Sequence, residues 1–401
     1  MKLFLTATGP GEVASWASII TKKAKKLGIE VIIFLLPSTF STGKEKIVAR
    51  RLLPNIKVFS VKETISFLFF SSTSFSGKKV LLHLGGEQVF AYLLSRKLNS
   101  PLVIYQWGNK LLKNITNNYL VSHEYFKNRL LSLKIPSSSI KVVGNFCVDK
   151  VKEALKEEKE LNLQKPLLTF LPASRDIEIS TVLPLLLKTA EILTNKTRIN
   201  FSIVLSPFIS IDKLENLLCK PVCGFKGGVR GKLKQNSNLY YLETPKGIPV
   251  AVVIDSPYTT IANSKLVVTL PGTKTEEIAA LGTPMWVVLP MNRPDLIPLW
   301  GIGGLLDYLP CGRILKKYVI LKKLPSFGFV TQANIITGRE IVPEFKGNIN
   351  PDLLAEKILK LWQDEAKLNQ ISSQLIELYK PSIGVCDRTL EILKEVAKTS
   401  S

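Results

Sequence analysis

The stretch from Leu266 to Arg293 constrains the fold of this chain more than any other. It reads LVVTLPGTKTEEIAALGTPMWVVLPMNR, which is an apolar run, a Pro-Gly turn, a helical pattern and a second apolar run. This order is typical of a strand, a turn, a helix and a second strand. Because the first run is too apolar to have one face in water, we expect it to lie in a parallel sheet that is covered on both faces.

The turn in this stretch predicts an anion-binding site. Pro271 and Gly272 end the strand, Thr273 and Glu276 have the spacing of a capping box, and Gly282 stops the helix. The unpaired amides and the positive dipole end at the start of such a helix suit a phosphate or diphosphate. An α/β protein has several such turns and only one or two bind a ligand, so other features have to identify the site.

The rest of the chain repeats this alternation in two series, and 401 residues are enough for two domains with their own cores. The first series predicts strands at 2–6, 29–37, 57–61, 80–85, 102–107 and 140–145. The second predicts strands at 167–172, 200–207, 250–255, 266–270 and 285–290. A charged helical stretch from Lys152 to Lys165 lies between them, and 351–398 predicts two or three closing helices, broken near Pro381. The predicted fold class is therefore α/β, with two parallel sheets.

The formal net charge of +22 predicts an anionic partner. The charge is spread along the chain as doublets such as Lys22-Lys23 and Lys316-Lys317. Phosphates, nucleic acid or a membrane surface would fit. No nucleic-acid motif appears, and the basic, Gly-rich stretch 223–235 is interpreted as a solvated excursion. No apolar run reaches the roughly 18 residues that span a bilayer, and the N-terminus lacks the apolar core of a signal peptide, so we expect a soluble or peripheral protein.

Cysteine and histidine usage indicates neither disulfides nor a metal. The five cysteines are irregularly spaced, which favours a reducing compartment. The two histidines, His83 and His123, and one close cysteine pair, Cys219 and Cys223, do not make a zinc site. The spacing of Gly9 and Gly11 is not the dinucleotide fingerprint, so no nicotinamide cofactor is predicted.

The segment from Ile65 to Phe75, ISFLFFSSTSF, carries four phenylalanines between Lys62 and the pair Lys78-Lys79. Most phenylalanine clusters belong to a buried core. Aromatic residues flanked by lysines would also serve as a shallow membrane contact, and both interpretations stay open.

Three runs in order resemble one family: LPASRDIEISTVLPLLLKTAEIL (171–193), PGTKTEEIAALGTPMWVV (271–288) and ANIITGREIVPE (333–344). Together with Gly11-Glu12 and the spacing from Gly144 to Asp149, they are similar to lipid-A-disaccharide synthases. The resemblance implies two Rossmann-like domains of the GT-B type that face across a cleft. An acceptor domain would comprise 1–160 and a returning helix at about 381–401. A nucleotide-sugar domain would comprise 161–380.

The resemblance also implies the chemistry. A UDP-sugar would donate its sugar, with inversion and without a metal or other cofactor, to a lipid-linked sugar phosphate at the membrane. The diphosphate would leave as an anion, which fixed cations and helix starts must stabilise. The donor-site residues are then expected to be Arg175, Ser174, Gly272, Thr273, Glu277, Asn334, Arg339 and Glu340.

Within this set, Arg175 is expected to meet the diphosphate, Glu277 the ribose hydroxyls, and Asn334 the donor directly. Three alternatives stay open. Arg175 could be a solvated arginine, Glu277 an ordinary surface glutamate, and Arg339 and Glu340 a structural ion pair.

The acceptor hydroxyl must lose a proton, and Glu87, Glu12 and His83 are the candidates in the first domain. Glu87 follows two glycines at a strand end, whereas His83 is expected to be buried in its strand and Glu12 could serve only the helix dipole. The first domain departs from the family pattern at Ala14-Ser15-Trp16, at LGGEQVFAY (84–92) and at Asn145. The resemblance therefore supports the reaction type better than the acceptor.

Other functions remain open. A nucleotide-sugar 2-epimerase would share the two-domain layout, and a non-catalytic basic protein could bind a membrane surface. The leading hypothesis places the protein in the cytoplasm, at the inner face of the plasma membrane, with a nucleotide-sugar donor, a lipid-linked or anionic acceptor and no nucleic acid as its partners. A homodimer is compatible with the resemblance.

Overall fold

The chain forms two compact units, which the computed structural model describes over residues 1–38, 41–107, 112, 115–218, 227–236, 239–294, 317–318, 320, 322 and 328–398. Unit 1 comprises Met1–Lys150 and Tyr379–Ser401, and unit 2 comprises Val151–Leu378. The sequence placed these divisions at 160 and 380. The first differs because the charged helical stretch continues a helix, α6 (Phe146–Glu157), that begins ahead of it.

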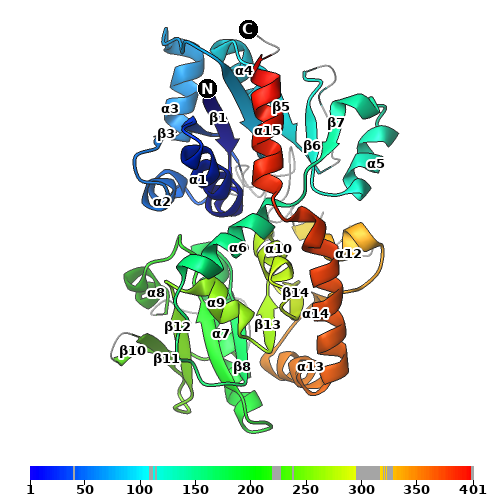
Figure 1. The fold of residues 1–401 in the computed structure, drawn as a ribbon. Coiled ribbons are helices and arrows are strands. Elements are labelled where there is room, and N and C mark those ends of the chain that lie inside the picture. The colour runs from blue at the N-terminus through cyan, green and yellow to red at the C-terminus, as the bar shows by residue number, and fades with distance from the viewer. Residues whose placement is uncertain are drawn as a thin grey trace. The chain divides into compact units, whose positions relative to one another are not determined.

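Unit 1 contains a seven-stranded sheet of parallel strands in the order β3-β2-β1-β4-β5-β6-β7 (Figure 1). Leu3 lies opposite Val31 on one side and Val80 on the other, and all three are buried, as expected for a sheet covered on both faces. The strands are β1 (Lys2–Ala7), β2 (Glu30–Leu35), β3 (Lys57–Phe59), β4 (Lys79–His83), β5 (Leu102–Tyr105), β6 (Tyr119–Val121) and β7 (Ile140–Val142).

The sequence missed β6. This strand has three residues and follows the polar pair Asn117-Asn118, so it is too short for apolar periodicity to reveal it.

The helical segment between β1 and β2 has two parts. Glu12–Ala17 forms a π-helix, η1, and α1 (Ser18–Lys26) follows it. A π-helix bonds each N–H to the carbonyl five residues earlier, and such wide turns are frequent at functional sites. The other helices that begin in unit 1 are α2 (Glu45–Leu52), α3 (Val61–Phe70), α4 (Gln88–Leu98), α5 (Glu124–Ser132), a 3₁₀ turn (Ser137–Ser139), α6, and α15 (Val385–Lys398).

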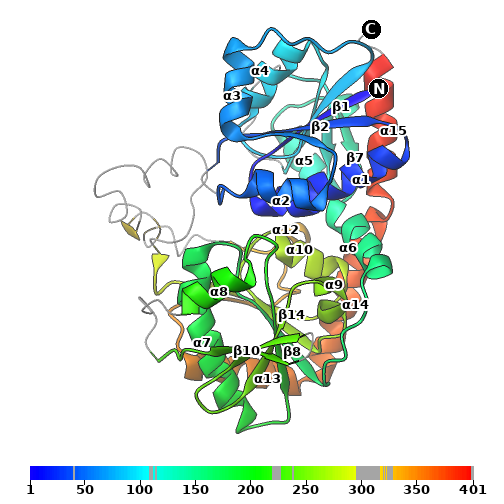
Figure 2. The same cartoon turned by 90° about the vertical axis from the view of Figure 1, so that its left-hand side faces the viewer.

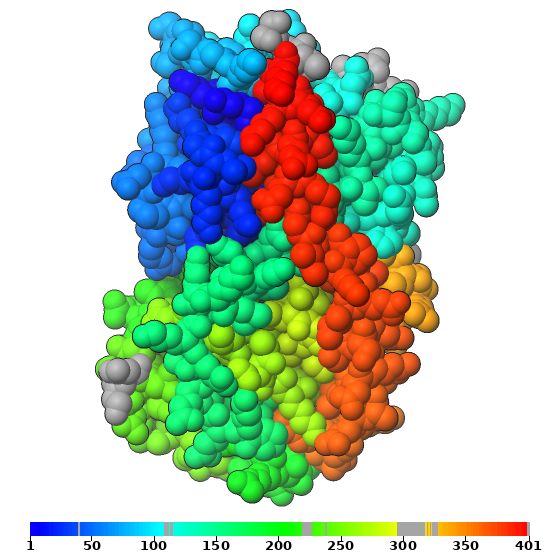
Figure 3. Space-filling model, in the orientation of Figure 1, coloured from blue at the N-terminus to red at the C-terminus, as the bar shows by residue number. Residues whose placement is uncertain are grey.

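The last helix, α15, returns to unit 1, where it packs against α1 and β4. Figure 3 shows this C-terminal segment, in red, beside the N-terminal part of the chain, in blue. The carboxylate of Asp149 accepts hydrogen bonds from the N–H groups of Gly384 at 2.8 Å and Cys386 at 2.9 Å. Gly144 has a φ of +106°, and a Cβ there would lie 2.7 Å from the Cα of Ser382. The spacing from Gly144 to Asp149 therefore serves to hold the start of α15.

Unit 2 contains an eight-stranded sheet in the order β10-β11-β12-β9-β8-β13-β14-β15. The strands from β12 to β15 are parallel, and β10 and β11 add an antiparallel edge. The strands are β8 (Leu167–Leu171), β9 (Asn200–Val204), β10 (Lys232–Asn236), β11 (Leu239–Glu243), β12 (Pro249–Val253), β13 (Leu266–Thr269), β14 (Met285–Pro290) and β15 (Glu344–Gly347).

The edge of this sheet corrects one prediction. Residues 232–235 were expected in a solvated excursion, but Lys232–Asn236 is the edge strand β10, paired along its whole length with β11. Its lysines alternate with less polar side chains, and charged residues of this kind protect an exposed strand edge. Residues 223–226 lie outside the described part of the chain.

Helices cover both faces of this sheet, and Figure 2 shows α7 and α8 on one side of it and α9 and α10 on the other. Helix α7 packs against α8 and α13, and α10 packs against α12 and β14. The helices are α7 (Asp176–Thr194), α8 (Ile211–Leu218), α9 (Pro257–Ala262), α10 (Thr273–Ala280), α12 (Gln332–Thr337), α13 (Pro351–Gln363) and α14 (Glu365–Tyr379). The closing helices α13, α14 and α15 confirm the helical prediction for 351–398, and a 3₁₀ turn at Lys380–Ser382 marks the expected break.

Candidate functional site

In unit 2 the fold brings two of the predicted anion-binding turns to one edge of the sheet. β8 and β13 are parallel neighbours, with Leu171 opposite Thr269. Ser174 and Arg175 follow the end of β8, and Gly272 and Thr273 follow the end of β13. The carboxyl ends of neighbouring parallel strands are where open α/β sheets bind ligands.

The turn after β8 is strained. Ala173 has a φ of +113°, a left-handed conformation that is rare for a residue with a Cβ and costs on the order of 1–3 kcal/mol. Arg175 comes two residues later and precedes the first residue of α7. Its guanidinium is paired with the carboxylate of Glu178, which also accepts from the Arg175 N–H. The ion pair with Glu178 thus fixes the Arg175 side chain, so Arg175 is not the freely solvated arginine that the sequence left open.

The turn after β13 leaves space for a ligand. Gly272 is exposed, has a φ of +154°, and no heavy atom lies within 4 Å of where its Cβ would be. The capping-box prediction is wrong: Thr273 is already inside α10, the cap position is Gly272, and no side chain caps the helix. Thr275 instead donates its hydroxyl to the carbonyl of Gly272 at 2.7 Å, and Glu276 is buried. Without a side-chain cap, the first amides of α10 can bind an anion.

Glu277 is fully buried, so the alternative of an ordinary surface glutamate is wrong. Its carboxylate accepts from the Tyr258 hydroxyl at 3.0 Å and from Lys274 Nζ at 2.5 Å. The Lys274 ammonium also lies 5.0 Å from the centroid of the Tyr258 ring. Both oxygens of Glu277 therefore already have a partner, and a ribose bound there, as predicted, would share the carboxylate with these partners or displace them.

Asn334 has a structural role in α12. Its side-chain nitrogen donates to the carbonyl of Val342 and to Glu344, and its oxygen accepts from the N–H groups of Ile341 and Val342, all at 2.7–2.9 Å. All four hydrogen-bonding positions of the carboxamide are therefore used. The predicted direct contact with a donor would require one of these bonds to break.

Arg339 and Glu340 are exposed in the loop that follows α12. The described structure contains no ion pair between them, which removes the alternative that the sequence left open. Glu340 instead accepts from the N–H of Glu344 at 3.0 Å.

Glu344 is a residue that the sequence analysis did not single out, although it ends the matched run 333–344. Its carboxylate is almost fully buried and accepts from the N–H groups of Val330 and Thr331, the Thr331 hydroxyl and Asn334. This one side chain ties the start of α12 to the start of β15. The run 333–344 therefore contains residues that stabilise the local fold as well as candidate donor-site residues.

In unit 1, Glu12 lies at the carboxyl ends of β1 and β4. Its Oε2 accepts from the Thr8 N–H at 2.7 Å, the Thr8 hydroxyl at 2.5 Å and the Gly9 N–H at 3.3 Å. The carboxylate lies so close to Gly85 that a Cβ on that residue would be 2.1 Å from Oε1. Burial raises the pKa of Glu12 above its ordinary value, although the hydrogen bonds from Thr8 and Gly9 oppose the shift.

The two other acceptor-side candidates differ from Glu12. His83 is buried in β4, its Nδ1 lies 2.7 Å from the Thr6 hydroxyl, and burial lowers its pKa to about 4, so it is neutral at pH 7. This is the buried, hydrogen-bonded histidine that the sequence favoured. Glu87 is exposed at the start of α4 and makes no capping hydrogen bond. The structure thus brings Glu12 together with the Gly85-Gly86 turn that precedes Glu87.

Two departures from the family pattern in unit 1 have structural roles. Trp16 is buried, with its ring centroid 5.5 Å from Tyr105 and 5.2 Å from Trp107. Asn145 accepts from the N–H of Cys147 at 2.9 Å and so begins α6. Large aromatic side chains therefore fill space beside Glu12's helix.

The phenylalanine-rich segment is partly buried and partly exposed. Phe67 is buried, with Phe34, Phe59 and Phe75 within ring-contact distance. Phe69 and Phe70 at the end of α3 are 64% and 85% exposed. Helix α4 lies beside α3 (Figure 2). It exposes Val89, Tyr92 and Leu93.

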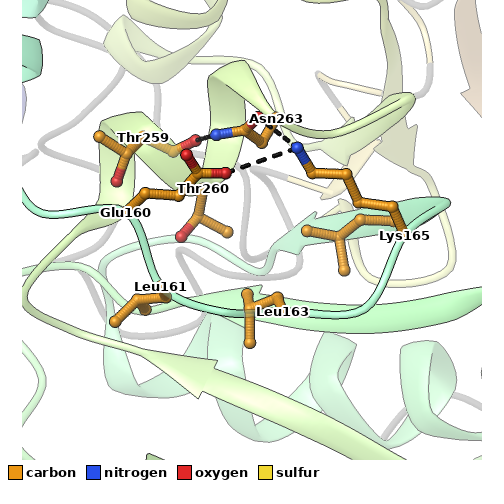
Figure 4. Close-up of a pocket in the computed structure, with 8 residues that line it drawn as sticks. Glu160, Leu161, Leu163, Lys165, Thr259, Thr260 and Asn263 are labelled. Carbon is orange, nitrogen blue, oxygen red and sulfur yellow. Dashed lines mark hydrogen bonds and ion pairs between the residues drawn. The ribbon is translucent and has the colours of Figure 1, made fainter.

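A small hollow in unit 2 lies away from these residues (Figure 4). It is lined by the segment before β8 and by α9, and Lys165 Nζ donates to Asn263 at 2.7 Å across it. Because Lys165 precedes β8, the hollow is at the amino ends of the strands, the end that open sheets do not use for ligands. The described residues contain no cluster of three or more His, Cys, Asp or Glu side chains that could hold a metal ion.

Comparisons with known proteins show distant sequence relatives, whereas no family model matches the chain. The chain is 24% identical over 290 residues to the lipid-A-disaccharide synthase of Sulfurihydrogenibium sp. and 22% identical over 311 residues to that of Persephonella marina. These alignments cover 70% and 73% of this chain, and they span only 65% and 69% of the relatives' own lengths.

Solved structures share the fold over nearly the whole chain. UDP-GlcNAc 2-epimerase from Neisseria meningitidis, solved with bound UDP-GlcNAc, has a TM-score of 0.56 at 14% identity and covers 98% of this chain and 100% of its own. MurG of Acinetobacter baumannii has a TM-score of 0.51 at 12% identity, with coverages of 98% and 99%. In sequence, then, the chain resembles lipid-A-disaccharide synthases, and its two α/β units have the fold of GT-B glycosyltransferases and UDP-GlcNAc 2-epimerases.

Proposed function

We propose that this protein is an inverting, metal-independent glycosyltransferase that transfers a sugar from a UDP-sugar to a lipid-linked or anionic acceptor at a membrane. One observation carries the proposal. The turns after β8 and β13 lie on neighbouring parallel strands, and they present Arg175 and the uncapped start of α10 at the same edge. A cation and a helix start placed together suit a diphosphate.

Unit 2 would stabilise the leaving group. As the bond between the sugar's anomeric carbon and the diphosphate oxygen breaks, negative charge collects on the diphosphate. The guanidinium of Arg175 and the amides of α10 would offset that charge. In the structure the Arg175 guanidinium is paired with the Glu178 carboxylate. A bound donor would therefore compete with Glu178 for the guanidinium or share it.

Unit 1 would supply the base. The acceptor hydroxyl loses its proton to the Glu12 carboxylate, its oxygen bonds to the anomeric carbon, and UDP leaves from the opposite face. The raised pKa of Glu12 makes it a better proton acceptor than an ordinary glutamate. Its place at the carboxyl ends of β1 and β4 supports this role, because open α/β sheets bind their ligands at that end.

The surface of α3 and α4 supports membrane association. Phe69 and Phe70 are exposed on α3, which packs against α4 and its exposed apolar residues, and Lys62 and Lys78 are exposed in the same region of the chain. Aromatic side chains can enter the interfacial layer while lysines attract anionic lipids. No helix among the described residues is long and apolar enough to cross a bilayer. A peripheral protein at the inner face of the plasma membrane fits these features.

Calorimetric binding of UDP, UDP-GlcNAc, UDP-glucose, GDP-mannose and NADH tests the donor assignment. The wild type should bind UDP species, and Arg175→Ala should weaken that binding roughly tenfold or more, which is the effect of losing a charged hydrogen-bonding group. Arg198→Ala is a matched control, because Arg198 is an exposed arginine that precedes β9, at the amino end of the same sheet.

Two results would contradict the proposal. One is that the wild type binds no nucleotide, and the other is that Arg175→Ala and Arg198→Ala have the same affinity for UDP species. Conversion of UDP-GlcNAc to its 2-epimer without an acceptor would instead identify an epimerase.

A further inference from the structure

Gln332, the first residue of α12, carries a carboxamide that has no partner. Its side chain is only 6% exposed, and both its nitrogen and its oxygen lack a hydrogen bond in the described structure. Asn334, two residues later in the same helix, has the same functional group and uses all four of its hydrogen-bonding positions. The contrast shows that partners are within reach of this helix but do not meet Gln332.

An unpaired buried carboxamide is costly. Burial removes the water that the amide would otherwise bond, and the large majority of buried side-chain polar groups in folded proteins have a partner. An apolar residue of similar size would fill the position without that cost. The unpaired carboxamide of Gln332 is therefore explained best by a bound group that supplies its hydrogen-bond partners.

The topology places Gln332 beside the donor site. β13, β14 and β15 are consecutive parallel strands, and α10 and α12 belong to the two crossovers between them. α10 begins shortly after β13 ends. Glu344, which holds the start of α12, lies opposite Val287, and Val287 lies opposite Thr269, the last residue of β13, so both helices begin near the carboxyl end of β13. The two helices pack against each other, as Figures 1 and 2 both show. Gln332 and the Gly272-Thr273 turn accordingly belong to the same edge of unit 2.

We propose that the Gln332 carboxamide recognises the transferred sugar of the donor. This inference rests on the proposed function and names the part of the donor that Gln332 contacts. A carboxamide is neutral and both donates and accepts, as sugar hydroxyls and an N-acetyl group do. A phosphate only accepts, so it would leave the Gln332 oxygen unpaired and facing negative charge. The diphosphate is better served by Arg175 and α10, which leaves the sugar for Gln332.

Gln332→Met tests the inference, because methionine has a similar length and no hydrogen-bonding amide. The matched control is Gln370→Met, an exposed glutamine on α14 of the same unit. Calorimetry would measure the affinity of each variant for UDP, UDP-GlcNAc and UDP-glucose, and thermal unfolding would measure Tm.

Gln332→Met should bind UDP like the wild type but bind at least one UDP-sugar about tenfold more weakly, as expected when a site built to pair with hydroxyls loses its polar group. Its Tm without ligand should equal or exceed that of the wild type, because the variant removes an unpaired buried group.

Three outcomes would overturn the inference: equal weakening for UDP and the UDP-sugars, unchanged affinity for every UDP-sugar, or a Tm several degrees lower with unchanged binding. Failure of the wild type to bind any UDP species would refute the proposed function itself, and the assignment of Gln332 with it. The wild-type titration and the variant ratio therefore separate the two failures.

Discussion

The carboxylate of Glu12 accepts two hydrogen bonds from Thr8, one from its N–H at 2.7 Å and one from its hydroxyl at 2.5 Å. These bonds fix one oxygen and leave the other against the Gly85 backbone. The carboxylate is therefore oriented before any ligand binds. An oriented base loses less freedom in the reaction than a mobile one.

Glu12→Gln should lower kcat by about 10²–10⁴-fold, the usual contribution of a general base. UDP binding should stay at the wild-type value, because Glu12 belongs to unit 1 and the predicted donor residues belong to unit 2. Steady-state kinetics and calorimetry on the same preparation would measure both. A variant with wild-type kcat would exclude Glu12 as the base, and exposed Glu87→Gln serves as the comparison.

The pH dependence of the reaction should reflect the raised pKa of Glu12. Only the carboxylate form accepts a proton, so kcat/KM should fall as the pH drops through the raised pKa, which lies above the ordinary value of 4.5. The contribution of Glu12 to the free energy of unfolding depends on pH in the opposite direction. A carboxyl whose pKa is raised by folding contributes stability below its unfolded pKa, and this contribution is lost as the pH rises through the folded value. Glu12→Gln should therefore be at least as stable as the wild type at pH 7, as measured by urea unfolding.

Gly85→Ala should displace Glu12. The added Cβ would lie 2.1 Å from Glu12 Oε1, so the carboxylate has to move and its hydrogen bonds to Thr8 have to break. We expect a loss of kcat close to that of Glu12→Gln. Gly328→Ala is the control, because no heavy atom lies within 4 Å of the Cβ it would add. Equal activity of both variants would show that the position of Glu12 does not matter.

Asp149→Ala should destabilise unit 1 by about 2–3 kcal/mol. Asp149 is 6% exposed and accepts from the two amides at the start of α15, so its removal leaves buried donors unpaired. Urea unfolding measures the loss. Asp387→Ala changes an exposed carboxylate in the first turn of the same helix and should have a much smaller effect. A similar loss in both variants would indicate that the charge near α15, and not the cap, is what matters.

Phe69→Ser with Phe70→Ser should weaken binding to vesicles of phosphatidylglycerol and phosphatidylcholine roughly tenfold or more, since two exposed aromatic side chains would no longer enter the interface. Sedimentation of vesicles at two salt concentrations measures this binding. Stability should not change, because both side chains are largely outside the core. Ile47→Ser alters an exposed apolar residue on α2 and should bind like the wild type. Unchanged binding of the double variant would contradict the membrane contact.

Much of the fold could be predicted from local sequence. Apolar runs such as VIIFLL and LVVTL gave the strands, because strands buried on both faces have no polar alternation to obscure them. The strands it missed, β6, β10, β11 and β15, are short or lie near a sheet edge. Their residues are polar or few, so they resemble the loops around them.

The candidate site was predictable only in part. The Pro-Gly turn pointed to Gly272. The Thr273 capping box was wrong because α10 begins one residue earlier than predicted, with Gly272 at the cap position. Glu344 and Gln332 gave no local signal. Their importance comes from burial and from the presence or absence of partners, which residue types alone do not reveal.

By itself the sequence determined the class of fold, the number of units, the positions of the turns after β8 and β13 and the family resemblance, because each depends on residues close together in the chain. Only the tertiary structure decided which carboxylates are buried or exposed, that Asn334 holds a loop while Gln332 is unpaired, and that Glu12 lies against Gly85. These features depend on contacts between segments far apart in sequence. Burial and hydrogen bonding across such contacts set the pKa values and the free polar groups that a catalytic site needs.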